Sequence, residues 1–539
     1  MKKIITFILC LVMCLPFMVN AVEIKPYFQA SFAGSEYDTF YNAVETKDGG
    51  IVAVGYTEST DLDGLINNGN IDGFIVKYDK NGDVLWKSIW GGNAREDFYS
   101  IAEMDNGNLV VVGTSRSTNI EGLVNFGNSD AIFIIYDKDG NLLSQKKMGG
   151  TSSDSFSDVL ILNDNEFILI GTSKSSEFLG SDSNGDSDAF ILKLDIEGNV
   201  KWINSFGGNK YDGFTKVKKT SDNGFVVIGY SMSTDIMDNG SGRFSLILKY
   251  DENGNSVWIN SWGNAPQGYS SYFKDVVELS DGYIAVGSGN RELDGKYSSN
   301  GMNSTLIKYD KNGNIIWEKL WGGSKEDFFN QIIECDDNTL LVVGGTSSEN
   351  IDGYTLKGFQ DICLLKYNKD GNVIWYSCFG GNSSDSSYKL FYNDNVIKFV
   401  GNTLSSNLEN VEIKGDVESF IVYADLIYNF NLVNDSIKGN VDIKQLGSTG
   451  VITPLANDGY EVDSIFVKDS IGNIVNVIKL EDGTYSFPLY TDVSVEVLFK
   501  EILTNPKTGV FNPIIFIPAI MVLGMCVYFI KSCEKSYEL

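Results

Sequence analysis

The clearest indication of the fold is the stretch Asp79-Lys80-Asn81-Gly82-Asp83-Val84-Leu85-Trp86-Lys87-Ser88-Ile89-Trp90-Gly91-Gly92. Its Asn-Gly pair is typical of a tight hairpin turn, and the Asx side chain at Asp79 preforms that turn by accepting a backbone N–H. The residues after the turn are strand-like, so Trp86 and Trp90, four positions apart, point to one face. The stretch predicts a β-hairpin whose second strand carries two tryptophans and ends at a Gly-Gly pair.

The same stretch recurs along the chain. Its closing glycine returns at Gly91, Gly149, Gly207, Gly263, Gly322 and Gly380, at spacings of 58, 58, 56, 59 and 58 residues. Each unit holds four strand-like runs, which in the second unit are 98–104, 109–114, 131–136 and 141–148. All eight tryptophans fall in the fourth run of a unit. Such regular recurrence favours packing between neighbouring units over a carbohydrate-binding platform.

Four antiparallel strands in a unit repeated seven times predict a β-propeller over residues 22–427. The seventh unit has a third strand at 419–424 but no Trp-bearing strand after it, and a matching strand stands alone at 27–32. We expect these two strands to share a sheet and close the ring, which removes exposed edges. The predicted fold class is all-β: a seven-bladed β-propeller closed by the N-terminal strand, a small all-β domain and a C-terminal transmembrane helix.

The repeat array resembles the bacterial β-propeller repeat proteins. Its Asp-x-Asn-Gly-x-x-x-Trp hairpin is similar to the docking motif of pyrroloquinoline-quinone-type propellers. The resemblance implies the fold and is nearly silent on activity.

A different all-β pattern occupies residues 428–500. Its strand-like runs at 459–465, 482–487 and 492–499 resemble the divergent internalin-type bacterial repeat found near the wall end of surface proteins. The resemblance implies a small spacer or adhesive module. Alternating apolar residues in the last run, Val493, Val495, Val497 and Phe499, predict a half-buried strand.

The two ends of the chain predict its compartment. Lys2 and Lys3 precede an apolar run, and residues 1–21 have the layout of a secretory signal peptide with cleavage after Ala21. Residues 510–530 carry no charge and would span about 31 Å as a helix, enough for a bilayer core. A short tail follows at 531–539. We therefore expect residues 22–509 outside a bacterial cell, with residues 510–530 in its membrane.

The linker 501–509 ends in Asn505-Pro506-Lys507-Thr508-Gly509. This pentapeptide resembles the sorting signal of Gram-positive surface proteins, which implies cleavage after Thr508 by a sortase and transfer to peptidoglycan. Asn505 stands where leucine is commonest, and Lys531 and Lys535 in the tail are offset by Glu534 and Glu538. A plain single-span membrane protein that sortase does not process is therefore the alternative.

Composition excludes several classes of function. The chain has no histidine, which removes Ser-His-Asp and Cys-His catalysis and His-based zinc sites. A formal charge of −29 argues against a nucleic-acid partner, because phosphate binding needs clustered Lys and Arg. Only Cys335, Cys363 and Cys378 lie in the exported part, and this sparse, odd set predicts no disulfide framework.

The loops between the second and third strands of the units share one rim and carry many acids. The densest run, 182–188, offers Asp182, Asn184, Asp186 and Asp188 as alternate oxygen ligands for Ca²⁺. The preferred interpretation is that these loops are solvated and form turns. No other cofactor is expected.

A binding or adhesion protein is the predicted function, with an extracellular protein or glycan as its partner and no catalytic residues. The alternative is an extracellular glycan-active enzyme, because a carboxylate-pair glycosidase needs no histidine. No single Asp/Glu pair stands out among the loop acids.

Overall fold

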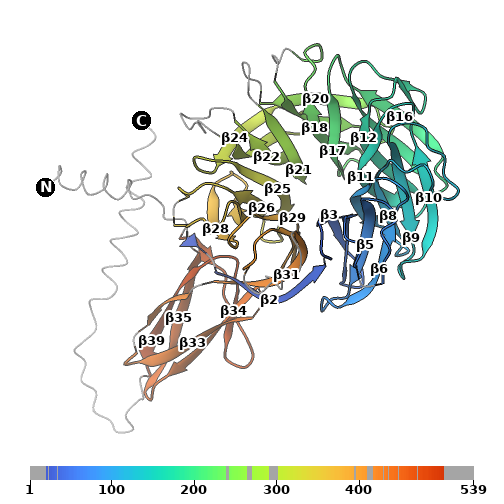
Figure 1. Cartoon of the computed structure of the whole chain (residues 1–539). Helices are drawn as coiled ribbons and strands as arrows, with labels where there is room; N and C mark the ends of the chain where they lie inside the picture. The colour runs from blue at the N-terminus through green and yellow to red at the C-terminus, as the bar shows by residue number, and fades with distance from the viewer. Residues whose placement is uncertain are drawn as a thin grey trace, which may run out of the picture. The chain divides into compact units, whose positions relative to one another are not determined.

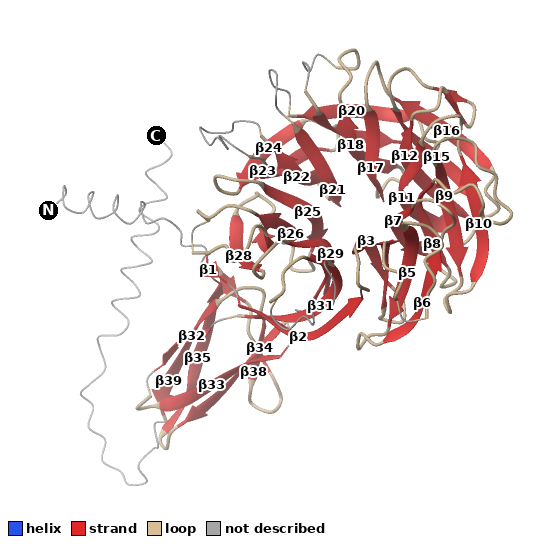
Figure 2. Ribbon diagram, in the orientation of Figure 1, coloured by secondary structure: helices blue, strands red, loops and turns tan. Residues whose placement is uncertain are grey.

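The computed structural model describes residues 20–502 except for 22, 33, 63, 238–241, 264–269, 291–300, 352, 394–395, 409–416, 429, 435, 447 and 470–471. Every regular element in these ranges is a β-strand (Figure 2). The all-β prediction is confirmed. Among the residues described, none forms a helix long and apolar enough to cross a bilayer. The predicted span at 510–530 lies outside them.

Seven sheets follow one another in the described ranges (Figure 1): each has four antiparallel strands, and one of them has a short fifth strand paired in parallel at its edge. The first four are β3 (Asp38–Glu45), β4 (Ile51–Thr57), β5 (Asp72–Tyr78), β6 (Val84–Trp90); β7 (Glu96–Glu103), β8 (Leu109–Ser115), β9 (Asp130–Tyr136), β10 (Leu142–Met148); β11 (Asp154–Asn163), β12 (Glu166–Ser173), β15 (Asp188–Asp195), β16 (Val200–Phe206); and β17 (Asp212–Lys219), β18 (Phe225–Ser231), β19 (Phe244–Tyr250), β20 (Ser256–Trp262). The other three are β21 (Ser271–Leu279), β22 (Gly282–Gly289), β23 (Asn303–Asp310), β24 (Ile315–Trp321); β25 (Asp327–Glu334), β26 (Leu340–Thr346), β27 (Asp361–Tyr367), β28 (Val373–Phe379); and β29 (Asp385–Asn393), β30 (Val396–Thr403), β31 (Glu418–Ile427), β2 (Glu23–Phe32).

The first strand of each sheet contacts the first strand of the next, and we call these seven the inner strands: β3, β7, β11, β17, β21, β25 and β29. The series closes on itself, because β29 also contacts β3. This is the arrangement of a β-propeller. Two short additions accompany it: β1 (Asn20–Ala21) pairs in parallel with β28, and β13 (Glu177–Phe178) pairs with β14 (Ser181–Asp182) inside one loop.

The first long strand closes the last sheet as the sequence predicts. β2 pairs antiparallel with β31, with Phe32 opposite Ser419 and Glu23 opposite Ile427. The apolar side chains at this junction pack together: Phe32, Phe40 of the first sheet and Val400 of the last are all buried in one cluster. The N-terminal strand therefore occupies an edge that would otherwise be unpaired.

Tryptophans on two of the fourth strands, β6 and β20, bond to the neighbouring sheet. The Trp86 indole donates a hydrogen bond from Nε1 to the Lys138 carbonyl of the next sheet, at 3.0 Å. Trp258 makes the same bond to Lys311, also at 3.0 Å. The prediction that the tryptophans pack between neighbouring units is confirmed for both residues.

The hairpin turns are held by the Asx residue expected there. Asp79 Oδ1 accepts the backbone N–H of Asn81 at 2.8 Å and that of Asp83 at 2.9 Å. Asp251 repeats these contacts with Asn253 and Asn255. Hydrogen bonds from Asn255 lower the pKa of Asp251, which matches a carboxylate that accepts backbone donors.

One disulfide corrects the expectation from cysteine usage. Cys363 of β27 and Cys378 of β28 stand opposite each other in the hairpin and are bonded. The pairing follows from register, because the turn between the two strands sets which residues face each other. Cys335 stays free and buried.

Two further sheets follow the propeller strands in sequence. Their strands are β32 (Phe430–Asn434), β33 (Gly439–Leu446), β34 (Thr449–Ala456), β35 (Tyr460–Asp469), β36 (Ile474–Val475), β37 (Ile478–Lys479), β38 (Tyr485–Pro488) and β39 (Val493–Glu501). The sheet orders are β32-β39-β35-β36 and β33-β34-β38-β37. Along β39, Val493, Val495, Val497 and Phe499 are buried, so the predicted alternation is confirmed.

Candidate functional site

Each inner strand contains a β-bulge at its fourth residue. A bulge inserts one unpaired residue and re-aims the side chains beside it. We call the inserted residues the bulge ring: Tyr41, Tyr99, Ser157, Thr215, Lys274, Asn330 and Tyr388. We call the residues that follow them the second ring: Asn42, Ser100, Asp158, Lys216, Asp275, Gln331 and Lys389.

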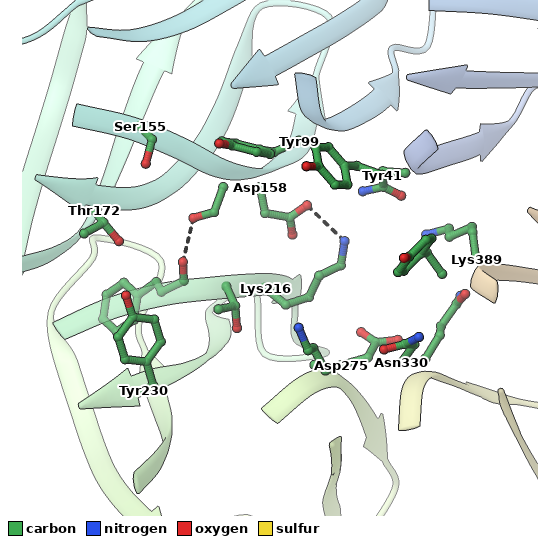
Figure 3. Close-up of a pocket in the computed structure, with 17 residues that line it drawn as sticks. Tyr41, Tyr99, Ser155, Asp158, Thr172, Lys216, Tyr230, Asp275, Asn330 and Lys389 are labelled. Atoms are coloured by element: carbon green, nitrogen blue, oxygen red, sulfur yellow. Dashed lines mark hydrogen bonds and ion pairs between the residues drawn. The ribbon is translucent and has the colours of Figure 1, made fainter. Parts of the chain in front are cut away.

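These two rings surround one cavity of about 460 Å³, which we call the axial pocket (Figure 3). All members except Ser100 line it, together with Ser155, Thr172, Phe214 and Tyr230. Thr172 is next to the end of β12, where the β12–β15 loop leaves, and Ser155 of β11 is paired with it. Each of the seven inner strands therefore contributes to one pocket at the centre of the propeller.

Part of the bulge ring joins neighbouring sheets. Ser157 Oγ donates a hydrogen bond to the Phe214 carbonyl of the next inner strand at 2.6 Å. Asn330 Nδ2 donates to the Ser387 carbonyl at 2.9 Å. These side chains satisfy carbonyl groups beside the next bulge and hold successive sheets together.

The second ring makes the complementary contacts. Asp158 Oδ2 accepts the N–H of Val217 at 3.0 Å, and Gln331 Oε1 accepts the N–H of Leu390 at 2.6 Å. Asp275 Oδ2 accepts the N–H of Ile332 at 3.2 Å. Each bond joins one inner strand to the next, so these acceptors serve the scaffold as well as the pocket wall.

Two lysines beside the pocket are compensated by these aspartates. Lys216 Nζ lies 2.9 Å from Asp158 Oδ1, and Lys218 Nζ lies 3.5 Å from Asp275 Oδ1. Asp158 Oδ1 also accepts the Ser100 hydroxyl at 2.6 Å. Burial lowers the pKa of Lys216, but Asp158 and Asp275 outweigh it, and the net pKa is raised.

Two other lysines of the pocket lack such a counter-charge within the described part of the chain. Lys389 Nζ lies 5.8 Å from the centre of the Phe391 ring, and no ion pair or hydrogen bond joins it to a described residue. Burial first, and then the positive charges of Lys216 and Lys218, lower the pKa of Lys389 to about 7. Burial and the charge of Arg243 lower the pKa of Lys274 in the same way.

Tyrosines form another part of the wall. The Tyr41 ring lies 5.6 Å from both Tyr56 and Tyr99, measured between ring centres. Across the pocket, the Arg243 guanidinium stands 4.6 Å from the centre of the Tyr230 ring and 4.7 Å from that of Tyr272. Figure 3 shows Tyr41 and Tyr99 together on one side and Tyr230 on another. Flat, partly apolar faces and single polar groups are the usual lining of a small-ligand site.

The recurrent acids at the loop exits have a structural role. Asp72, Asp188 and Asp361 each accept the backbone N–H of the residue four positions earlier, at 2.6, 2.6 and 2.7 Å. All three are buried. The loops form turns as expected, but these carboxylates are not solvated. They fold the loop back onto the start of the next strand.

The predicted calcium ligands are divided between surface and interior. Asp188 is buried and Asp186 is exposed, and the backbone N–H of Asn184 donates a hydrogen bond to Asp188. The side chain of Asp182 is outside the described set. No group of three or more Asp, Glu or Cys able to hold a metal ion occurs among the residues that the structure describes. The Ca²⁺ site stays a prediction. The sorting motif Asn505-Pro506-Lys507-Thr508-Gly509 lies beyond the described residues.

Sequence reasoning missed the axial pocket. A signal was present, because Phe40, Phe98, Phe156, Phe214, Phe273 and Phe329 recur in register and each is followed by two residues that differ from unit to unit. Variable polar residues at a fixed position inside a regular repeat indicate a surface that packing does not determine. The acidic loops were predicted as candidate sites because they are the longest non-repeating segments.

Comparisons with known proteins give only distant relatives. The chain is 24% identical over 312 residues to the regulatory protein FlaEY of Caulobacter vibrioides, a match that covers 56% of this chain and 29% of that protein. The chain thus spans less than a third of that relative's length. No protein-family model matches the chain.

Solved structures to which the chain is distantly similar include a WD40 domain, a propeller and a glycosidase. The Neurospora crassa Pan2 WD40 domain superimposes with a TM-score of 0.41 at 8% identity, covering 76% of this chain and 98% of that domain. The Dos1 propeller superimposes with a TM-score of 0.38 at 10% identity, and the match covers 75% of this chain and 95% of that propeller. An α-L-arabinofuranosidase from Fusarium graminearum superimposes with a TM-score of 0.38 at 11% identity, and the match covers 60% of this chain and 93% of that enzyme.

Proposed function

We propose that this chain is a non-catalytic binding protein of the bacterial cell surface, which takes up its ligand in the axial pocket. The pocket carries the proposal. It is large enough for a small molecule, at about 460 Å³, and its wall varies from sheet to sheet where the rest of the repeat is regular. In this proposal the sheets make a seven-bladed propeller closed by the N-terminal strand.

The contacts of the pocket acids favour binding over catalysis. A glycosidase needs one carboxylic acid that donates a proton and one carboxylate that acts as base or nucleophile. Asp158 and Asp275 are the carboxylates of the axial pocket. Each accepts a backbone N–H and stands beside a lysine ammonium, so neither is placed to donate a proton.

Display outside the cell is part of the proposal. Residues 1–21 would direct export, and residues 428–500 would serve as a short stalk. The pentapeptide at 505–509 would then be joined to peptidoglycan by sortase, or residues 510–530 would keep the protein in the membrane. The Cys363–Cys378 disulfide supports export, because disulfides persist in oxidising compartments and are rare in the reducing cytosol.

A binding screen with product analysis tests this function. The full chain, purified in detergent, would be offered to arrays of glycans and small metabolites, and each bound compound would be recovered after a long incubation and analysed by mass spectrometry. We expect saturable binding and recovery of every compound unchanged. Conversion of a bound compound into product at a rate that depends on Asp158 or Asp275 would replace the binding role with the enzymatic one.

A further inference from the structure

The charge of the axial pocket is opposite to that of the protein. The chain has 42 Lys and Arg against 71 Asp and Glu, yet three lysines and two aspartates line the pocket. The three are Lys216, Lys274 and Lys389. Charges interact more strongly in a partly buried site than in bulk water, so a small excess of one sign influences which ligands bind.

The aspartates do not neutralise all of these lysines. Asp158 bonds to Lys216, Ser100 and the Val217 N–H. Asp275 accepts the Ile332 N–H through Oδ2, while its Oδ1 lies 3.5 Å from Lys218 Nζ and has no hydrogen-bond partner among the described residues. Lys274 and Lys389 come from β21 and β29, and neither has an ion pair with a residue that the structure describes. Lys389 is half-buried, whereas Lys274 is exposed. A half-buried ammonium without a counter-charge is unfavourable, so an anion bound beside Lys389 would be stabilised.

Neither lysine contributes to the junctions between sheets. Ser157 and Asn330 of the bulge ring, and Asp158, Asp275 and Gln331 of the second ring, bond to the next inner strand. Lys274 and Lys389 have no such bond among the described atoms. Their place in the pocket is therefore not accounted for by closure of the ring.

We infer that the axial pocket binds a small organic carboxylate, held by the ammonium of Lys389 with Lys274 as a second cation. The inference rests on the proposed binding function and names its ligand class. One negative charge suits the site better than two, because Asp158 and Asp275 line the same pocket and repel a dianion such as phosphate. Tyr41, Tyr99 and Tyr230 offer flat faces for the uncharged part of the ligand.

The environment of Lys389 makes this binding depend on pH. Lys216 and Lys218 from β17 oppose its positive charge, while Asp158 from β11 and Asp275 from β21 favour it, and burial outweighs them all. With a pKa of about 7, roughly half of Lys389 is neutral at pH 7. A carboxylate binds the protonated form, so affinity should fall as pH rises above 7 and level off below 6.

Chemical labelling of lysines tests the inference. The full chain in detergent would be treated with an amine-reactive reagent at pH 7, alone or with acetate, with acetamide, which is its neutral isostere, or with inorganic phosphate. Peptide mapping then measures the extent of labelling at each lysine. Only the neutral amine reacts, so Lys389, with a pKa of about 7, should react at least about tenfold faster than exposed Lys138, whose pKa is raised by Asp139. Acetate should slow Lys389 several-fold and leave Lys138 unchanged, whereas acetamide should have no effect.

A substitution separates binding from folding. Lys389→Met removes an uncompensated charge, so the variant should melt at or above the temperature of the wild type and should bind acetate at least about tenfold more weakly. Lys138→Met is the matched surface control and should change neither property. A lower melting temperature for Lys389→Met would show a structural lysine and overturn the inference.

The remaining outcomes are distinguishable. Equal protection of Lys389 by acetamide would overturn the charge argument, and stronger protection by phosphate than by acetate would overturn the carboxylate assignment. If acetate does not protect Lys389 but compounds from the binding screen still occupy the pocket, the carboxylate inference is rejected and the binding function stands. Absence of any ligand from the pocket would reject both.

Discussion

The indole of Trp86 lies against Gly140, the turn glycine of the neighbouring sheet. A Cβ atom built on Gly140 would stand 2.7 Å from Cδ2 of Trp86, closer than any real side-chain contact. Gly140 also has a φ of +85°, a conformation that favours glycine. Gly140 is therefore required for two independent reasons: the turn needs a left-handed backbone conformation, and the Trp86 indole occupies the space of a Cβ atom.

Gly140→Ala should lower the free energy of unfolding by about 3 kcal/mol, from the φ cost and the displaced indole together. Gly64→Ala is the control, because Gly64 has a φ of +83° and nothing within 4 Å of its Cβ position. It should cost only about 1 kcal/mol. Denaturant unfolding monitored by tryptophan fluorescence measures both. Equal losses would mean that the packing of Trp86 does not constrain the turn.

Asp72 should make stability depend on pH. It is fully buried, and burial together with the nearby charge of Glu96 raises its pKa to about 6, even though the Asn68 N–H favours the charged form. A raised pKa in the folded state gives stability that is present below pH 4 and is lost as pH rises through 6. A pKa that is higher by about two in the folded chain than in the unfolded chain corresponds to roughly 3 kcal/mol.

Asp72→Asn removes this proton-linked contribution. Its free energy of unfolding, relative to wild type, should therefore rise by about 3 kcal/mol between pH 4 and pH 7. Asp186→Asn, at an exposed position, is the matched control variant. Urea titrations at several pH values supply the numbers, and a flat profile for Asp72→Asn would show that Asp72 is ionised throughout.

The Cys363–Cys378 bond should be detectable by counting thiols. Within residues 22–509 the unfolded, unreduced protein should expose one thiol, from Cys335, and the reduced protein three. Native Cys335 should not react at pH 8, because burial raises the pKa of its thiol to about 11. Replacing both bonded cysteines by Ala should cost about 2–3 kcal/mol. Three free thiols before reduction would contradict the bond.

Wall anchoring is tested by Thr508→Ala. If sortase processes the pentapeptide, wild-type protein should resist boiling detergent until the wall is digested with muramidase, and the variant should stay with the membrane and be extracted by detergent alone. The reason is that cleavage needs the Thr508 carbonyl, whereas membrane residence depends on the uncharged residues 510–530. Full extraction of the wild type by detergent would favour the plain membrane protein.

Much of the fold was predictable because it is encoded by short-range signals. The Asn-Gly turns, the Asx residue before them and the tryptophans each act within one hairpin or between adjacent repeats, so a period of about 58 residues carries them along the chain. The pairing of β2 with β31 was predictable because the last unit lacks a fourth strand and one extra strand precedes the first unit. The Cys363–Cys378 bond was missed because cysteines were counted without regard to hairpin register.

The candidate site was not predicted, because it depends on closure of the ring. Lys216 and Asp158 are 58 residues apart and meet only when neighbouring inner strands converge on the axis. Lys389 acquires its unusual environment from β11, β17 and β21, which are distant in sequence. The loop acids were visible as a cluster, yet Asp72, Asp188 and Asp361 turn inward to bind backbone N–H groups.

Filling the axial pocket with a larger side chain should block binding if the ligand occupies this pocket. Ser155→Tyr places an aromatic ring at a register that Tyr272 and Phe328 already occupy on β21 and β25, so the fold should tolerate it. Dissociation constants for the compounds found in the binding screen would be measured by calorimetry on the wild type, on Ser155→Tyr and on the rim-loop variant Asp186→Ala. We expect at least about a tenfold weaker affinity for Ser155→Tyr and an unchanged affinity for Asp186→Ala. Unchanged affinity in a folded Ser155→Tyr protein, with loss in Asp186→Ala, would mean that the ligand binds the acidic loops and not the axial pocket.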